Sequence, residues 1–367
     1  MNALIILGLL VVLMLTGMPI SISLGLTVLS FLFFLTEVPI ESVALKLFTG
    51  IEKFEIMAIP FFILAGNFLT HGGVAKRMIG FATSMVGHWH GGLGLGGVVA
   101  CALFAAVSGS SPATVVAIGS ILLPAMVKAG FPKSFGAGVI TTSGALGILI
   151  PPSIVMVMYS VSTNTSVGAL FMAGVIPGLL LAFFLGLTTW YRAKKNNYPC
   201  QPKATWAERW VAFRKAIWGL LLIVVVMGGI YSGMFTPTEA AAMSAVYAFV
   251  VAVFVYKDMG LKDVPRVLLS SANMSAMLLY IITNAVLFSF LLTHENIPQQ
   301  MADQMIGTGI GVIGFLLISN VLLLIAGNFM EPSSIVLILA PILFPIAIKL
   351  GIDPVHFGII MVVNMEV

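Results

Sequence analysis

Long apolar segments separated by short polar or Gly/Pro breaks dominate the hydrophobicity pattern of the chain. Residues 3–35 are apolar except for an interruption at 16–19, Thr-Gly-Met-Pro, which predicts two tilted helices joined by a tight turn. Further apolar segments of helical length lie near residues 169–191, 216–231 and 239–256. Because one helical crossing needs roughly 20 apolar residues, the chain has room for about ten or more crossings. The pattern therefore predicts an all-helical, polytopic membrane protein.

Two breaks fall inside apolar segments rather than between them. Residues 108–112, Ser-Gly-Ser-Ser-Pro, have an apolar arm on each side that is short for a full crossing, which predicts a re-entrant helical hairpin with its tip at these residues. A longer break at residues 141–153 includes Pro151 and Pro152. Because a lipid-exposed helix does not tolerate so many freed backbone groups, we expect this segment to be unwound and either buried in protein or lining a cavity.

Composition and charge support a membrane protein and exclude two other classes. Hydrophobic residues make up 60% of the 367 residues and charged residues only 8%, about a third of the roughly 25% that is usual in soluble domains. The net charge of +4 is too small and too dispersed to indicate a nucleic-acid partner. Residues 192–215 form a hydrophilic loop with seven Lys and Arg residues against the single acid Glu208. The positive-inside rule predicts that this loop is cytoplasmic.

Pairs of similar motifs recur at a nearly constant spacing along the chain. The break at Pro332 lies 220 residues after the break at Pro112, and Thr293 lies 223 residues after Thr70. Two basic residues follow soon after Thr70, whereas none follows Thr293 over the next ten residues. This difference is expected if equivalent loops face opposite sides of the membrane. Inverted repeats with paired broken hairpins are typical of secondary transporters.

The repeat divides the chain into three parts. We predict a first inverted repeat over residues 1–165, which contains the first hairpin, and a linking span with the basic loop over 166–215. The second inverted repeat covers 216–367 and contains a matching hairpin with its tip near 327–334. The parts together predict a polytopic inverted-repeat transporter with two re-entrant helical hairpins.

The hairpin tips carry the first candidate chemistry. Carbonyl and hydroxyl oxygens freed at Ser108 and Ser110 suit a hard cation such as Na⁺, because each can replace a water of hydration. The second tip repeats the pattern with Ser333 and Ser334 beside Pro332, so two ion sites around a central substrate are predicted. The alternative for either tip is a Gly/Ser bend that packs against a neighbouring helix.

Isolated polar residues in apolar segments are the other candidates. Glu331 is a functional candidate because a carboxylate at membrane depth is costly to bury, and the alternative is a protonated or serine-paired structural glutamate. Glu366 is a second candidate of the same kind. Asn67 and Asn284 place amides on apolar helices, where interhelical hydrogen bonding without a ligand is an equally good explanation. The sequence has no Walker loop, dinucleotide fingerprint, HExxH motif or GxSxG elbow. We therefore expect no enzyme activity and no cofactor, with an ion gradient as the source of energy.

Six longer motifs follow one another along the chain. They are Gly-Met-Pro at 17–19, Ile-Pro-Phe-Phe-Ile-Leu-Ala-Gly-Asn at 59–67, the first tip at 108–114, the break at 144–152, Phe-Thr-Pro-Thr-Glu-Ala at 235–240 and the second tip at 327–334. In this order they resemble the large membrane subunit of tripartite ATP-independent periplasmic (TRAP) transporters, DctM-like, and the resemblance runs over all 367 residues. It implies a Na⁺-driven transporter of the bacterial inner membrane that works with a small membrane subunit and a periplasmic substrate-binding protein. It also implies an elevator fold like that of divalent-anion/sodium symporters.

The resemblance also implies roles for single residues. The first sodium site would use Ser108, Ser110, Gly144 and Gly147. The second would use Gly327, Asn328 and Glu331. Substrate contacts are predicted from Ser111, Pro112, Pro151, Pro332, Ser333 and Asn284. Family substrates are small organic anions such as C4-dicarboxylates, sialic acids and other sugar acids, and the similarity favours dicarboxylates. Neither tip contains Lys or Arg, so helix N-termini, hydroxyls and bound cations would hold the anion.

The end of the sequence departs from the family pattern. Glu366 lies 222 residues after Gly144, so the counterpart of the first unwound segment would begin where this sequence stops. We therefore expect about sixty further residues, with a second unwound segment and a closing span. A chain without them would not transport.

These observations together predict an elevator transporter subunit in which Na⁺ at two hairpin tips orders a midplane site for a carboxylate. Three alternatives stay open: a stand-alone sodium/carboxylate symporter, a TRAP subunit for sialic acid or another sugar acid, and, from a different class, a polytopic membrane enzyme. A purely structural partner fits poorly with so many helix breaks.

Overall fold

The fold is all-helical wherever the structure describes it. The computed structural model describes residues 2–36, 39–307, 309, 311–328 and 330–366. Within these residues every regular element is a helix, and seven helices, or eight if one bent pair counts as a single span, are long and apolar enough to cross a membrane. The other apolar helices have 10–17 residues, and they include one arm of each hairpin described below. The prediction of an all-helical, polytopic membrane protein is confirmed.

The N-terminal apolar segment forms two helices, as predicted. Helix α1 (Asn2–Leu15) ends at a turn in which Gly17 has a φ of +83°, and α2 (Ile20–Leu35) packs back against it. A positive φ strains residues with a side chain, so glycine permits this sharp reversal. Helix α3 (Ile40–Thr49) and a short 3₁₀ turn, η1 (Phe54–Met57), follow and lead into α4.

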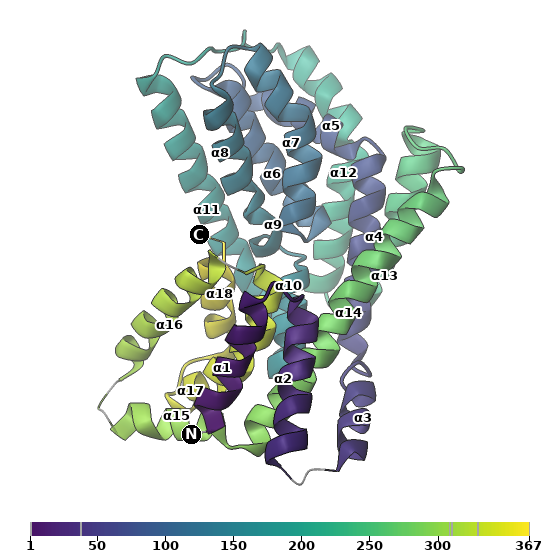
Figure 1. Ribbon diagram of the computed structural model, residues 1–367. Coiled ribbons are helices and arrows are strands. Elements are labelled where there is room, and N and C mark those ends of the chain that lie inside the picture. The colour runs from purple at the N-terminus through teal and green to yellow at the C-terminus, as the bar shows by residue number, and fades with distance from the viewer. Residues whose placement is uncertain (1, 37–38, 308, 310, 329, 367) are drawn as a thin grey trace.

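Two helical hairpins lie at opposite ends of the molecule (Figure 1). The first consists of α6 (Gly92–Ser108) and α7 (Ser111–Lys128), and the second consists of α16 (Val312–Gly327) and α17 (Pro332–Lys349). Each hairpin reverses direction where the sequence predicted a tip, and Figure 1 shows both tips directed toward the middle of the molecule. The two hairpins therefore bring their Ser- and Pro-containing tips toward the same region.

The predicted break over residues 141–153 is narrower than expected. Helix α8 (Lys133–Gly144) continues through Thr141 and Thr142, whose hydroxyls donate to carbonyls four residues earlier, at 2.9 and 2.8 Å. The one-turn helix α9 (Leu146–Leu149) follows, and α10 (Ile154–Thr163) resumes at an angle of 42°. Helical structure is interrupted at Ala145 and again over residues 150–153, where Pro151 and Pro152 lack the amide donor that a helix needs. Pro151, Pro152 and Ser153 are buried, as the prediction required.

Small side chains join two of the longer helices. Helix α13 (Pro237–Val250) continues as a π-helical turn, η2 (Val251–Val255), and packs along α4 (Ala58–His71) more extensively than any other described pair of helices. Its buried residues include Ala240, Ala241, Ala245 and Ala248. A Cβ added to Gly72, at the end of α4, would lie only 2.5 Å from the Cβ of Ala252. Small residues of this kind let membrane helices approach closely.

The remaining helices surround the hairpins and the broken helix, which consists of α8, α9 and α10. Helix α14 (Val264–His294) packs against α2, α4 and α17, and α11 (Val167–Lys195) packs along α6. The basic loop after α11 lies at the end of the molecule from which the first hairpin enters (Figure 1). The other helices are α5 (Val74–Val86), α12 (Trp206–Tyr231), α15 (Ile297–Gly307) and α18 (Pro354–Asn364).

Candidate functional site

A cavity of about 400 Å³ is lined by both hairpin tips. The first tip contributes residues 109–112, and the second contributes Glu331, Ser333 and Ser334. Apolar side chains of the broken helix and of α14 form much of the remaining wall, among them Ile148. Two chain segments that the sequence pairs as repeat equivalents thus meet at one cavity.

The first tip is packed tightly against the broken helix. The Gly109 carbonyl accepts a hydrogen bond from the amide of Ile154, at 3.1 Å. A Cβ added to Gly147 would lie 2.6 Å from the Ser110 carbonyl oxygen and 2.7 Å from the Ser111 Cα. Since real Cβ atoms do not approach backbone so closely, glycine at position 147 is what permits the tip to pack against α9.

The structure brings together three of the four residues predicted for the first sodium site. Ser108 and Ser110 flank the tip, Gly147 contacts it, and the Ser108 hydroxyl lies 2.8 Å from that of Thr114. Gly144 lies one turn earlier and packs instead against Val115, within the body of α7. Among the described residues, no group of three His, Cys, Asp or Glu is placed to hold a metal. A cation here would therefore depend on hydroxyl and carbonyl oxygens, a donor set that fits Na⁺.

An unpartnered hydroxyl lies on α8, one residue before Gly144. The Ser143 side chain is 1% exposed, and its Oγ has no hydrogen-bond partner among the described residues. Most buried polar groups do have a partner, so an orphaned hydroxyl one residue before Gly144 calls for one. The sequence contained the serine but gave no sign that its hydroxyl would be buried and unpaired.

The second tip is held by a different set of contacts. The Ser333 hydroxyl donates to Glu331 Oε1 at 2.6 Å, which is the serine-paired arrangement of the structural alternative. A Cβ added to Gly327 would lie 3.5 Å from the Met365 carbonyl oxygen and 3.7 Å from that of Asn364. The Asn328 amide donates to its own helix, at the Leu324 carbonyl, 2.8 Å away.

Glu366, a second candidate carboxylate that the sequence assigned to neither site, contacts the first tip. The Ser111 hydroxyl donates to Glu366 Oε1 at 3.1 Å, which links the first tip to the segment that follows α18. The available signal was the position of Glu366 after a long apolar run, since a carboxylate at membrane depth is a functional candidate. Pairing with Ser111 could not be read from the sequence, because the two residues are 255 positions apart.

Three predicted substrate contacts lie outside the cavity lining. Pro151, in the break between α9 and α10, and Pro332, at the start of α17, do not line it, although residues on either side of the break and Ser333 do. The Asn284 amide donates to the Tyr280 carbonyl at 2.9 Å, and its Oδ1 occupies the space where a Cβ on Gly25 would lie. Asn284 therefore packs α14 against α2. Ser111, Pro112 and Ser333 do line the cavity.

No basic side chain lines the cavity within the described part of the chain. Helix α7 begins at Ser111 and α17 begins at Pro332, so the N-terminal ends of both helices lie at the tips. Helix N-termini carry partial positive charge and unpaired amide donors, which favour anions. The electrostatics of the cavity therefore combine two helix ends with the carboxylate of Glu331.

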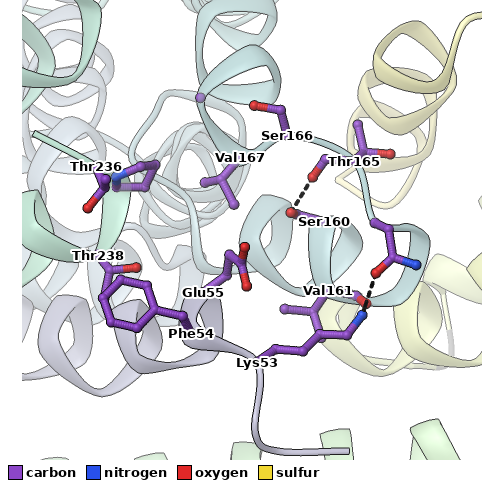
Figure 2. Close-up of a pocket in the computed structure, with 13 residues that line it drawn as sticks. Lys53, Phe54, Glu55, Ser160, Val161, Thr165, Ser166, Val167, Thr236 and Thr238 are labelled. Carbon is purple, nitrogen blue, oxygen red and sulfur yellow. Dashed lines mark hydrogen bonds between the residues drawn. The ribbon is translucent and has the colours of Figure 1, made fainter. Parts of the chain in front are cut away.

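A second, polar cavity of about 480 Å³ lies on the opposite end of α10 from the tips. As Figure 2 shows, Lys53 reaches the end of α10, where its ammonium donates to the Val161 carbonyl at 2.5 Å and to Asn164 Oδ1 at 2.6 Å. Partial burial lowers the pKa of Lys53, and the nearby Glu55 carboxylate opposes that shift. Lys53 thus anchors the segment before α4 to the helix that leads away from the first tip.

Apolar spans, two opposed hairpins and a shared cavity define a polytopic membrane protein of the transporter class. Residues 7–367 match the family described as "Tripartite ATP-independent periplasmic transporter, DctM component". The chain belongs to this family, the large permease subunits of TRAP transporters, and is a multi-pass protein of the bacterial inner membrane.

Curated relatives cover most of the chain. It is 76% identical over 381 residues to the C4-dicarboxylate TRAP transporter large permease protein DctM of Rhodobacter capsulatus, covering 100% of this chain and 87% of that protein. The protein of the same description from Pseudomonas aeruginosa is 57% identical, over 89% of this chain and 77% of its own length. The sialic acid TRAP transporter large permease protein SiaM of Vibrio cholerae is 37% identical, over 97% of this chain and 83% of its own length.

A solved structure supports the fold. The YdaH transporter of Alcanivorax borkumensis superimposes with a TM-score of 0.59 at 14% sequence identity, covering 90% of this chain and 78% of that one. At so low an identity the likeness concerns the fold alone.

Proposed function

We propose that this chain is the large permease of a TRAP transporter that takes up a C4-dicarboxylate. The observation that carries the proposal is the cavity lined by both tips, where α7 and α17 begin and no described lining residue is basic. Two helix N-termini at one cavity suit a substrate with two carboxylates, because each end can favour one negative charge. The relatives described as C4-dicarboxylate permeases support this substrate over a sugar acid.

Na⁺ is the coupling ion in this proposal. Ser108 and Ser110, with the backbone around Gly147, would hold one ion at the first tip. A second ion would be held by the backbone around Gly327, with Glu331 nearby. Positive charge at the tips would offset the Glu331 carboxylate and would favour an anionic substrate in the cavity.

Two partners and one movement complete the proposal. A small membrane subunit and a periplasmic substrate-binding protein would work with this chain, as the family description "tripartite" supports. The hairpins, the broken helix and α11 would move together against the remaining helices in an elevator motion. Such a motion would carry the cavity between the two sides of the membrane while leaving its lining intact.

Reconstituted transport tests the proposal. The full-length permease with its small subunit would be placed in proteoliposomes, and uptake of radiolabelled succinate would be measured with and without an inward Na⁺ gradient and a loaded periplasmic protein. We expect uptake only when both are present. Uptake with Na⁺ alone would instead identify a stand-alone symporter. Uptake of sialic acid but not succinate would show that the substrate is a sugar acid and not a C4-dicarboxylate.

A further inference from the structure

A groove of about 660 Å³ lies between α5 and the first turns of α12, and it shares no lining residue with the cavity at the hairpin tips. Gly80 of α5 and Ala207 and Ala212 of α12 line it with small side chains, which leave room at its base. It lies on the end of the molecule that carries the basic loop at 192–215, which the positive-inside rule assigns to the cytoplasm.

Arg77 and the two acidic residues of the groove, Asp258 and Glu208, already form ion pairs or hydrogen bonds within the protein. Arg77 forms an ion pair with Asp258, and its guanidinium stacks 3.8 Å from the centre of the Tyr256 ring. The carboxylate of Glu208 accepts hydrogen bonds from the backbone amide and the hydroxyl of Thr205, at 2.7 and 2.9 Å. These pairs fix the walls of the groove and leave little capacity for a ligand.

Two lysines of the groove are not neutralised in this way. Lys76 comes from α5 and Lys215 from α12, and both are exposed. Neither forms a salt bridge with any carboxylate that the structure describes. The backbone of Lys215 is held in place, because its carbonyl accepts a hydrogen bond from the Tyr256 hydroxyl at 2.7 Å. Two ammonium groups from different helices thus share one groove without a counter-ion from the protein.

Aromatic residues show at what depth of the membrane the groove lies. On α12, Trp206 is 80% exposed and Trp210 is 62% exposed, and each is adjacent in sequence to a residue that lines the groove, Ala207 and Val211 respectively. Trp side chains gather at the level of lipid headgroups, where an apolar ring and a polar N–H are both accommodated. The groove therefore opens at headgroup depth on the cytoplasmic leaflet.

We propose that this groove binds the phosphate of an anionic phospholipid such as phosphatidylglycerol. Lys76 and Lys215 would contact the phosphodiester, while the small residues of the base would accommodate the glycerol backbone. The exposed Val211 and Trp210 would contact the start of the acyl chains. Charge complementarity and headgroup depth favour this ligand, because basic pockets between membrane helices on the cytoplasmic side suit anionic headgroups.

Native mass spectrometry of the purified permease with its small subunit tests the proposal. The protein would be titrated with phosphatidylglycerol, with phosphatidylcholine of the same acyl chains, and with glycerol 3-phosphate as a free phosphate. A Lys76→Gln/Lys215→Gln double variant would be compared with wild type. Lys128→Gln/Lys133→Gln is the matched control, since these lysines are also exposed and lie at the same end of the molecule, on the first hairpin and α8.

Wild type is expected to retain one phosphatidylglycerol in preference to phosphatidylcholine and to bind no glycerol 3-phosphate. The double variant should bind phosphatidylglycerol roughly thirtyfold more weakly, because two lysines lose their attraction to the headgroup, and the control should match wild type. Equal retention of phosphatidylglycerol in wild type and double variant would overturn the proposal. Loss of the small subunit from the double variant, with lipid binding unchanged, would show instead that an acidic protein segment occupies the groove.

Discussion

The Ser111 hydroxyl donates a hydrogen bond to Glu366 Oε1 at 3.1 Å. Gly327, at the end of α16, lies beside the carbonyls of Asn364 and Met365. The first tip therefore contacts Glu366 and the second lies beside Asn364 and Met365, so both tips meet one short segment, although they enter from opposite ends of the molecule (Figure 1). A substitution in this short segment would therefore change the packing at both proposed ion sites.

Removing the Ser111 hydroxyl should weaken substrate binding without unfolding the protein. We expect Ser111→Ala to raise the KM for succinate about fivefold, the equivalent of one lost hydrogen bond. Uptake kinetics in proteoliposomes measure this change. Ser120→Ala is the control, because Ser120 is on the same helix and bonds only to the Ala117 carbonyl.

Substitutions of Glu366, the acceptor in the same hydrogen bond, test the contact from its other side. Glu366→Gln keeps an acceptor oxygen for Ser111, whereas Glu366→Ala does not, so only the alanine variant should reproduce the effect of Ser111→Ala. Equal kinetics in all three variants and wild type would show that the contact has no role in transport.

Gly147→Ala should abolish transport, because the new Cβ would lie 2.6 Å from the Ser110 carbonyl oxygen. Overpacking of this kind costs about 1–3 kcal/mol and would push the first tip away from α9. We expect the half-saturating Na⁺ concentration to rise beyond measurement, while the protein still inserts and runs as a monodisperse peak.

A glycine in open space provides the control for that substitution. Gly138 also lies on the helix before the break, but nothing lies within 4 Å of a Cβ added there. Gly138→Ala should therefore transport like wild type. If both variants lose transport equally, the cause is helix flexibility and not the close approach to the tip.

Ser108→Ala tests the first proposed sodium site. The Thr114 hydroxyl retains its bond to the Ser110 carbonyl, at 2.9 Å, so the substitution leaves no orphaned donor. A hydrogen bond or ligand contact to a charged group contributes about 1.5–3 kcal/mol, so the half-saturating Na⁺ concentration should rise at least about tenfold. Thr188→Ala, which removes a hydroxyl that bonds to its own helix at Phe184, should leave sodium dependence unchanged.

Asn284 should affect stability and leave substrate affinity unchanged. Its side chain packs α14 against Gly25 of α2, outside the cavity lining. We expect Asn284→Ala to lower the thermal unfolding midpoint, with a loss of about 1 kcal/mol from the helix contact, and to leave the KM for succinate within error. A raised KM with an unchanged midpoint would restore the asparagine to the substrate site.

The breaks in the hydrophobic pattern were sufficient to predict both hairpin tips. Serine, glycine and proline interrupt an apolar run at 108–112 and again near 332, and a membrane helix cannot lose its backbone bonds there unless the chain turns inside protein. The same reasoning overestimated the break at 141–153, because threonine hydroxyls bond within α8 and do not end it. The Na⁺ sites and the three-part division of the chain stay predictions.

Sequence alone determined which segments are helical, where they break and which residue types are available at membrane depth, because lipid forces each segment to satisfy its own backbone. Tertiary structure decided which of those residues meet. Ser111 pairs with Glu366 across 255 positions, whereas Asn284 faces Gly25 and not the cavity. Such pairings depend on how helices rotate and approach one another, and that is set by close contacts at glycines such as Gly147 and not by hydrophobicity along the chain.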